Sequence, residues 1–232
     1  MKAMTFNTQH CLNYIERKID FQVMADAIKQ CDADIVGLNE MYEWGETAEY
    51  EKQTAVLSEL TGLKYSYFAK AFLVFGKHAY GNGFISKHPI LSAETILVPD
   101  AERIPGHVHY ETRCLLKAKL EGGITVIVTH FGLNEEEQLK SVETILQHIE
   151  PEKCILMGDF NVMPEDEILN PIRSKMKDVA ECFTEPKFSY PSDKPNRKID
   201  YIFVSKDIDV VSADIPAIVA SDHRPHTAEI NL

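Results

Sequence analysis

The chain has few cysteines, and their spacing excludes several kinds of protein. Five are scattered along the sequence without a CxxC pair: Cys11, Cys31, Cys114, Cys154 and Cys182. An odd, scattered set argues against a disulfide scaffold and against a zinc site, and it fits a reducing compartment. We therefore predict a cytoplasmic location.

Long apolar runs are missing as well. No run approaches the roughly 20 apolar residues that a membrane-spanning helix needs. The segment from Met1 to Asn7 carries one basic side chain and no long apolar stretch. The sequence therefore predicts neither a transmembrane segment nor a secretion signal.

Basic residues are fewer than acidic ones. The chain has 24 Lys and Arg against 36 Asp and Glu, a net charge of −12. Proteins that bind a nucleic-acid backbone usually carry a basic footprint, and the linear pattern has none. The balance disfavours nucleic acid as a partner, although it leaves a local basic cleft open. We expect the acidic stretches at 43–51 and 135–137 to be solvated faces.

The length predicts one domain. With 232 residues, 44% of them apolar, the chain can bury a sizeable core. No repeat, low-complexity segment or long linker divides it, so we expect a single domain over residues 1–232.

Apolar periodicity predicts strands mixed with helices. Expected helices run from Asp20 to Gln30, from about Thr47 to Leu60 with Gly62 as its cap, and from Asn134 to Ile149. Expected strands are Lys2–Asn7, Ile35–Leu38, Cys154–Gly158, Ile199–Ser205, Val210–Ser212 and Thr227–Ile230, with further strands between Tyr65 and Val128. Such a mixture predicts an α/β protein whose mixed or antiparallel sheets are flanked by helices.

One hairpin is especially clear. The β-rich runs 114–120 and 124–129 flank Glu121-Gly122-Gly123. A two-residue turn at the two glycines or one residue earlier is compatible with this pattern, so two registers stay open. In either register Arg113 and His130 lie within two residues of one another at the same end of the hairpin. A guanidinium beside an imidazole suits an anionic group such as phosphate.

One apolar run has two interpretations. The apolar run from Ala71 to Phe75 is either an exposed loop suited to lipid or, as we favour, a core strand.

Asn134 and Glu137 have the spacing of a capping pair at a helix start. The stripe of the third expected helix comprises Leu139, Val142, Ile145, Leu146 and Ile149.

Unusual polar residues share one location pattern, because each lies at an end of an expected strand. They are Asn7, Glu40, Arg113, His130, Asp159, Asn161, Asp200, Asp222 and His223. Each has an ordinary alternative: Gly158 to Asn161 is compatible with a turn, and Arg113 with a surface pair to Glu111. Since loops at one edge of a sheet commonly hold functional side chains, the shared pattern favours a site.

Eight segments in order resemble one known family, the endonuclease/exonuclease/phosphatase superfamily, which includes pancreatic deoxyribonuclease, apurinic endonucleases, bacterial sphingomyelinases and inositol polyphosphate 5-phosphatases. The resemblance implies a four-layer α/β/β/α sandwich of two packed mixed sheets. The matching segments are 5–7, 37–40, 81–90, 111–113, 129–131, 158–161, 197–202 and 221–225.

The resemblance also implies a metal site. Glu40, helped by Asn7, would bind a divalent metal through oxygen, which suits Mg²⁺ or Mn²⁺ better than zinc. Asp222 would bind the same or a second metal. Asn39 stands where many members have Gln, and Gln9 stands where some nucleases have a carboxylate, which argues against a second metal.

For catalysis, the resemblance implies that Asp159 orients and deprotonates the attacking water and that Asn161 holds the phosphate. His223, positioned and kept protonated by Asp200, would stabilise the transition state. Three more side chains would contact phosphate oxygens: His130, Arg113 and Asn82.

We therefore expect a metal-dependent hydrolase of phosphate esters. The favoured substrate is a small or lipid-derived phosphodiester, attacked in line by a water that Asp159 activates. The alternative is an endonuclease or exonuclease on DNA or RNA, and a third hypothesis is a non-catalytic phosphate-binding module. The compact length leaves little room for the inserted loops that usually determine substrate choice in the superfamily.

Overall fold

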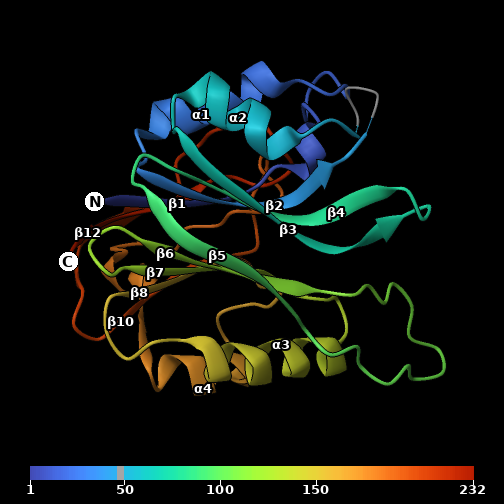
Figure 1. Cartoon of the computed structure of the whole chain (residues 1–232). Helices are drawn as coiled ribbons and strands as arrows, with labels where there is room; N and C mark the ends of the chain where they lie inside the picture. Colours follow the sequence, from blue (N-terminus) through green and yellow to red (C-terminus); the bar gives the residue numbers. More distant parts are fainter. Residues whose placement is uncertain (46–49) are drawn as a thin grey trace.

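A computed structural model describes residues 1–45 and 50–232 of the chain. Two six-stranded sheets lie face to face, and helices cover the outer face of each (Figure 1). The first sheet has the order β11 (Asp209–Asp214), β12 (His226–Asn231), β1 (Lys2–Asn7), β2 (Ile35–Glu43), β4 (His78–Ser86) and β3 (Tyr65–Val74). The second has the order β5 (Ile90–Leu97), β6 (Cys114–Leu120), β7 (Thr125–His130), β8 (Cys154–Asp159), β10 (Asp200–Ser205) and β9 (Met176–Asp178).

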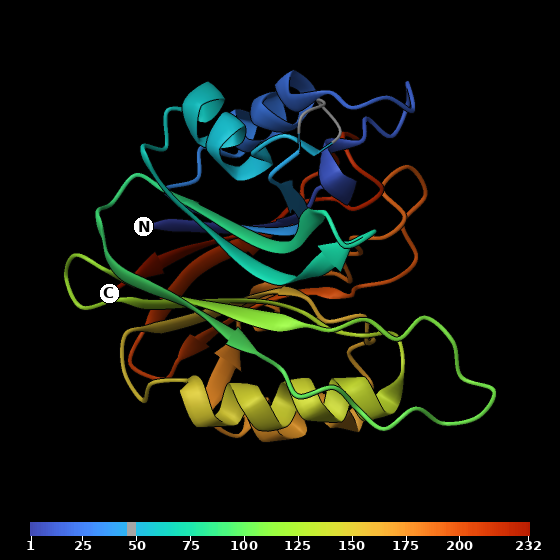
Figure 2. The same ribbon diagram turned by 45° about the vertical axis from the view of Figure 1, so that its right-hand side comes forward.

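The four layers are visible from two directions. Helices α1 (Phe21–Cys31) and α2 (Gln53–Thr61) cover the first sheet, and α3 (Glu135–His148) and α4 (Asn170–Arg173) cover the second (Figures 1 and 2). Both sheets are mixed, because β1 pairs with β2 and β7 with β8 in parallel among otherwise antiparallel neighbours. This architecture confirms the predicted α/β/β/α sandwich. In the part of the chain that the structure describes, no helix is long and apolar enough to span a bilayer.

Apolar side chains fill the space between the sheets and the space beneath each helical layer. Gly37 in β2 shows how closely the sheets approach. A Cβ at this position would lie 2.7 Å from the Sδ atom of Met157 and 3.0 Å from a methyl carbon of Val128, both on the opposing sheet. Any side chain at position 37 would force these neighbours to move.

The strand directions bring polar residues to one edge of the sandwich. Asn7 and Asn39 are partners in the parallel pair β1–β2, and His130 and Asp159 are partners in the parallel pair β7–β8. β10 runs antiparallel to β8 and begins at this edge, so Asp200 lies opposite Asp159. Parallel neighbours end at the same edge, which explains why residues far apart in sequence meet here.

β2 continues beyond the strand expected from the sequence. Its pairing with β4 shifts between Leu38 and Met41 and then continues to Glu43. Glu40 lies at this irregularity with a φ of +62°. The expectation that Glu40 follows the strand is therefore wrong, since it lies within the strand at a shift of register. Such irregularities change the direction of a side chain without ending the sheet.

α2 begins later than expected. Of the predicted start near Thr47, residues 47–49 lie outside the described residues, and the helix itself starts at Gln53. The Gln53 side chain accepts the N–H of Tyr42 at 2.8 Å and donates to the carbonyl of His10 at 2.9 Å, which anchors the first turn. Gly62, with a φ of +77°, caps the helix as predicted.

The hairpin between β6 and β7 has neither of the two registers considered. Lys119 pairs with Thr125, and the N–H of Leu120 donates to the carbonyl of Ile124 at 2.8 Å, so the connection is a three-residue loop, 121–123. Both glycines of this loop have positive φ, 88° and 81°, which side chains rarely adopt. The two-residue turn was therefore a wrong prediction, but Arg113 and His130 do lie at the same end of the hairpin.

β3 is an edge strand, and its apolar run is partly exposed. Leu73 is 41% exposed, and Phe75, beyond the end of the strand, is 82% exposed. The expectation of a core strand over 71–75 is wrong at these positions, because β4 covers β3 on one side only and the hairpin extends past the rest of the sheet (Figure 1).

α3 has nearly the expected bounds but differs in detail. Leu139 is 47% exposed, so it is not part of the buried stripe. Asn134 donates to the Glu137 carboxylate at 2.7 Å, and its side chain accepts no backbone N–H of the helix, so the predicted capping pair does not form. Glu137 and Glu43 are buried, at 6% and 7% exposure, which corrects the expectation of solvated faces at these positions.

Candidate active site

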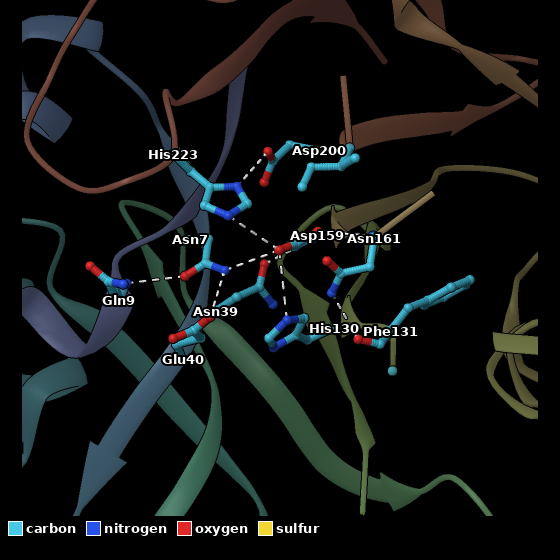
Figure 3. Close-up of polar contacts among 12 residues, drawn as sticks. Asn7, Gln9, Asn39, Glu40, His130, Phe131, Asp159, Asn161, Asp200 and His223 are labelled. Atoms are coloured by element: carbon cyan, nitrogen blue, oxygen red, sulfur yellow. Dashed lines mark hydrogen bonds and ion pairs between the residues drawn. The ribbon is translucent and has the colours of Figure 1, made fainter. Parts of the chain in front are cut away.

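The predicted polar residues come from both sheets and meet at the edge described above (Figure 3). A cavity of about 590 Å³ opens there. Seven of the predicted residues line it: Glu40, Arg113, His130, Asp159, Asn161, Asp222 and His223. Asn7 and Asp200, both fully buried, lie behind the lining and contact it.

Asp159 is at the centre of the arrangement. One carboxylate oxygen, Oδ2, accepts a hydrogen bond from Nδ2 of Asn7 at 3.1 Å. The same oxygen lies 3.6 Å from Nε2 of His130 and 3.6 Å from Nε2 of His223. The other oxygen accepts the N–H of Asn161 at 2.9 Å. Burial raises the pKa of Asp159; the charge of His223 opposes this rise and that of Asp200 adds to it. Such a carboxylate is a better proton acceptor than an exposed one.

His223 is held by Asp200. Its Nδ1 lies 2.8 Å from Oδ2 of Asp200, whose carboxyl group is fully buried. Burial by itself lowers the pKa of His223, but the carboxylates of Asp200 and Asp159 raise it well above 6.5. His223 is therefore an imidazolium at neutral pH, with its Nε2–H directed toward Asp159.

His130, in contrast to His223, is a neutral imidazole. Burial lowers the pKa of His130 well below its ordinary value, and the charges of Arg113 and His223 lower it further. Nη1 of Arg113 lies 3.1 Å from Nδ1 of His130. Because a guanidinium can only donate, Nδ1 accepts and the ring proton is on Nε2. The cavity thus contains one charged and one neutral imidazole on either side of Asp159.

Arg113 is buried although it pairs with Glu111, at 3.1 Å. The alternative of a surface pair is therefore only half right: the pair exists, but the guanidinium lies in the cavity wall. Its Nε–H has no hydrogen-bond partner among the residues that the structure describes.

Glu40 and Asp222 are the candidate ligands for a cation. Glu40 accepts from Nδ2 of Asn7 at 3.0 Å and lies 3.6 Å from Nδ1 of His10. Burial raises the pKa of Asp222, the charge of His223 lowers it, and the charge of Glu40 raises it again. A cation between these carboxylates would relieve that repulsion, so this part of the cavity fits a divalent ion with oxygen ligands.

Asp159, Asp200 and His223 form another group that could hold a metal, with one ligand atom of each within 4.8 Å of the others. Oδ2 of Asp200 accepts the hydrogen bond from His223, while its Oδ1 has no hydrogen-bond partner among the described residues. Asn7 turns its Nδ2 rather than its oxygen to Glu40, and its oxygen accepts the N–H of Gln9 at 3.0 Å. In this arrangement Asn7 orients the two carboxylates instead of offering a ligand.

Two asparagines differ in their access to the cavity. Asn161, with a φ of +52°, lines it and donates to the carbonyl of Phe131 at 3.1 Å. Asn82 does not line it: its amide accepts from Asn39 at 2.8 Å and donates to the carbonyl of Cys114 at 2.9 Å. The structure therefore does not bring Asn82 to where a phosphate would contact it. Asn39 connects Asn82 to the centre of the site, because the side-chain oxygen of Asn39 accepts the N–H of Asp159 at 3.0 Å.

Several residues that line the cavity were not identified from the sequence. Tyr42, Phe72 and Tyr80 form one side, and Tyr190 and Arg197 lie with His223 and Asp222 in the same cavity. Arg197 belongs to a segment that was recognised, but only its Asp200 was assigned a role. No local signal marks the aromatic residues, since only the order of the strands brings them together.

Comparisons with known proteins agree with this arrangement. A family model described as "Endonuclease/Exonuclease/phosphatase family" matches residues 4–223. The uncharacterized protein YbhP of Escherichia coli K12 is 25% identical over 260 aligned positions, which cover 100% of this chain and 96% of that protein.

Two solved structures have the same fold. An endonuclease/exonuclease/phosphatase from Beutenbergia cavernae has a TM-score of 0.79 and 21% identity, covering 100% of this chain and 71% of that one. Another, from Bacteroides vulgatus, has a TM-score of 0.75 and 23% identity, covering 100% and 98%. At these identities the likeness concerns the fold alone.

Proposed function

Because the chain belongs to the endonuclease/exonuclease/phosphatase family, whose members are phosphoesterases, we propose that it is a divalent-metal-dependent phosphodiesterase. We propose a small or lipid-derived phosphodiester as substrate. The observation that supports this best is the position of Asp159, a buried carboxylate with a raised pKa between two imidazoles. A base, two N–H donors and a guanidinium thus converge on one cavity.

In the proposed reaction a water oxygen attacks phosphorus in line with the departing alkoxide. Asp159 takes the proton of that water, and the bond from phosphorus to the alkoxide oxygen breaks. His223, Arg113 and His130 donate to the oxygens on which negative charge accumulates, and Asn161 holds the phosphoryl group. His223 begins as an imidazolium and so also has a proton to give to the alkoxide.

Glu40 and Asp222 would hold the divalent cation, Mg²⁺ with Mn²⁺ as a substitute. When bound, the cation supplies positive charge that polarises the phosphoryl group and stabilises the departing oxygen. Asn7 contributes by fixing the Glu40 carboxylate at 3.0 Å and the Asp159 carboxylate at 3.1 Å from one amide nitrogen.

The proposal treats residues 1–232 as one catalytic domain, because β1 and β12, from the two ends of the chain, pair with one another. It also places the protein in a reducing compartment such as the cytoplasm. In support, all five cysteines are free thiols, and burial raises the pKa of Cys11 to about 12 and that of Cys31 to about 11.

Hydrolysis of bis(p-nitrophenyl) phosphate with Mg²⁺ tests the proposal. We expect turnover by the wild-type protein, its loss with EDTA, its recovery with added Mg²⁺, and its loss in Asp159→Asn. Asp34→Asn is the control, since Asp34 is a partly buried carboxylate next to the first residue of β2, outside the cavity. Full activity in Asp159→Asn would show that this carboxylate is not the base.

DNA and RNA should be tested in the same assay at low ionic strength. With a net charge of −12, we expect neither to be degraded at a rate comparable with the small diester. Preferential degradation of a nucleic acid would replace the proposed substrate class with the nuclease alternative.

A further inference from the structure

Three aromatic side chains form a ladder across neighbouring strands at the cavity. Tyr42 of β2 is the register partner of Tyr80 of β4, and Tyr80 is the register partner of Phe72 of β3. The ring centroids of Tyr42 and Tyr80 are 5.3 Å apart, and those of Phe72 and Tyr80 are 5.2 Å apart. Directly opposed residues in a sheet point to the same face, so the three rings make a continuous wall.

The wall belongs to the same cavity as the catalytic groups. All three rings line it together with Glu40 and Arg113. Tyr42 follows Glu40 by two positions in β2, beyond the shift of register between Leu38 and Met41. A phosphoryl group held between Asp159 and Arg113 would therefore have an aromatic surface beside it.

The three rings lie outside the three main apolar clusters of the protein. The apolar cluster between the sheets and the clusters beneath the helices do not include Tyr42, Phe72 or Tyr80. Tyr80 is nevertheless 9% exposed, and burial holds the pKa of its phenol well above 10.0, so it stays neutral. The three rings thus pack against one another outside the three apolar clusters, and all three line the cavity.

Lysines are concentrated in the segment that contains two strands of the wall. Between Glu59 and Glu94 the chain has four lysines and no acidic residue, although its net charge is −12. This segment contains β3 and β4, which supply two of the three rings. None of these lysines lines the cavity, and Lys87 pairs with Asp34 at 3.4 Å. The cation that faces a ligand beside the wall is therefore Arg113.

We propose that the substrate carries a planar aromatic group on an alcohol of its phosphate ester, and that this group binds against Tyr42, Phe72 and Tyr80. The inference rests on the proposed function, because the phosphoryl position beside Asp159 fixes where the ring lies. A flat ring makes offset or edge contacts with three aromatic side chains at once, which a methyl or a non-planar group does not. The volume of about 590 Å³ suits a ligand of one or two rings together with its phosphate.

Binding of non-hydrolysable phosphonates to the wild-type protein tests the proposal without relying on turnover. Titration calorimetry with Mg²⁺ would compare benzylphosphonate, cyclohexylmethylphosphonate and methylphosphonate. We expect benzylphosphonate to bind at least about tenfold more tightly than methylphosphonate and to exceed the cyclohexylmethyl compound. Thymidine 5′-monophosphate distinguishes the two sources of a planar ring: if it binds more tightly than benzylphosphonate, the ring is a nucleobase, and otherwise a simple aryl group.

Phe72→Leu removes one ring while it keeps an apolar side chain of similar size. We expect the ratio of benzyl to methyl affinity to fall about fivefold, and the ratio is an internal control for general damage to the fold. Tyr65→Leu, at the other end of β3 and 39% exposed, is the matched control and should leave the ratio unchanged.

A benzyl-to-methyl ratio near one, equal affinity for the benzyl and cyclohexylmethyl compounds, or an unchanged ratio in Phe72→Leu would overturn the proposal. These outcomes are separate from failure of the proposed function. If no phosphodiester is hydrolysed but the affinity ratio and its dependence on Phe72 hold, the aromatic site stands and the catalytic proposal falls.

Discussion

Asp200→Asn isolates the electrostatic contribution of one buried carboxylate to the charge of His223. The asparagine keeps the shape and still accepts the hydrogen bond from Nδ1, which is 2.8 Å from Oδ2 in the native protein. Only the negative charge is lost. Burial then acts on His223 with less opposition, so the pKa of its imidazole should fall.

The structure gives the size of the effect. Asp200 is fully buried and His223 is 4% exposed, so solvent screens the pair little. Removing one partner of a buried ion pair costs about 3–5 kcal/mol, and one pKa unit corresponds to about 1.36 kcal/mol. We therefore expect the pKa of His223 to fall by about two units or more.

The change has consequences for pH dependence. In the native protein the raised pKa of His223 contributes stability that is fully present below 6.5 and is lost as pH rises through the raised value. In Asp200→Asn most of that stability is absent. Catalysis that needs the imidazolium should also decline at a lower pH, so the alkaline limb of the rate profile moves toward neutrality.

The assay is an NMR titration of the histidine ring protons in the native protein and in Asp200→Asn. The chain has nine histidines, so the His223 signal is assigned by its absence from His223→Gln. The pH dependence of kcat/KM is recorded on the same samples. An unchanged His223 pKa in Asp200→Asn would refute the reasoning, and a fall without a shift of the alkaline limb would separate the charge of His223 from catalysis.

Three other predictions follow from the site and the core. The raised pKa of Asp159 predicts that kcat/KM increases with pH through a value above 3.8, since only the ionised form accepts a proton; a rate already constant from 3.8 upward would contradict it. Arg113→Lys should lower kcat/KM by about 10²-fold or more, because an ammonium lacks the planar fork whose two terminal nitrogens contact His130 and Glu111 separately. Steady-state kinetics that match those of the native protein would exclude that role. Gly37→Ala should lower the free energy of unfolding by about 1–3 kcal/mol, because the new Cβ would lie 2.7 Å from Sδ of Met157. An unchanged midpoint of urea unfolding would show that the sheets accommodate the methyl group without loss of stability.

The sequence predicted much of the fold because most strands are short apolar runs ended by polar or turn residues. β1 has its expected bounds, and α1 begins directly after Asp20, whose side chain accepts the N–H of Val23 at 3.1 Å. The bounds of β1 and the start of α1 are determined by residues that are neighbours in the sequence. The four-layer arrangement, in contrast, came from the resemblance. The strand order was not predicted, because neighbours such as β1 and β12 are far apart in the chain.

Where the structure differs from the sequence predictions, the reasons are non-local. Asn82 lies in a matching segment, but its amide bonds to Asn39 and to the carbonyl of Cys114, and it is not among the residues that line the cavity. The hairpin register depended on one extra loop residue, which two adjacent glycines accommodate as easily as a tighter turn. The aromatic wall combines residues from separate strands, and no single segment of sequence indicates it.

The most direct test of the central claim is hydrolysis of a phosphodiester in ¹⁸O-labelled water with Mg²⁺. If a water activated by Asp159 attacks phosphorus, each turnover places one labelled oxygen in the phosphate product and none in the released alcohol, and Asp159→Asn forms no labelled product. Label in the alcohol, or labelled phosphate formed by Asp159→Asn at the native rate, would contradict the mechanism.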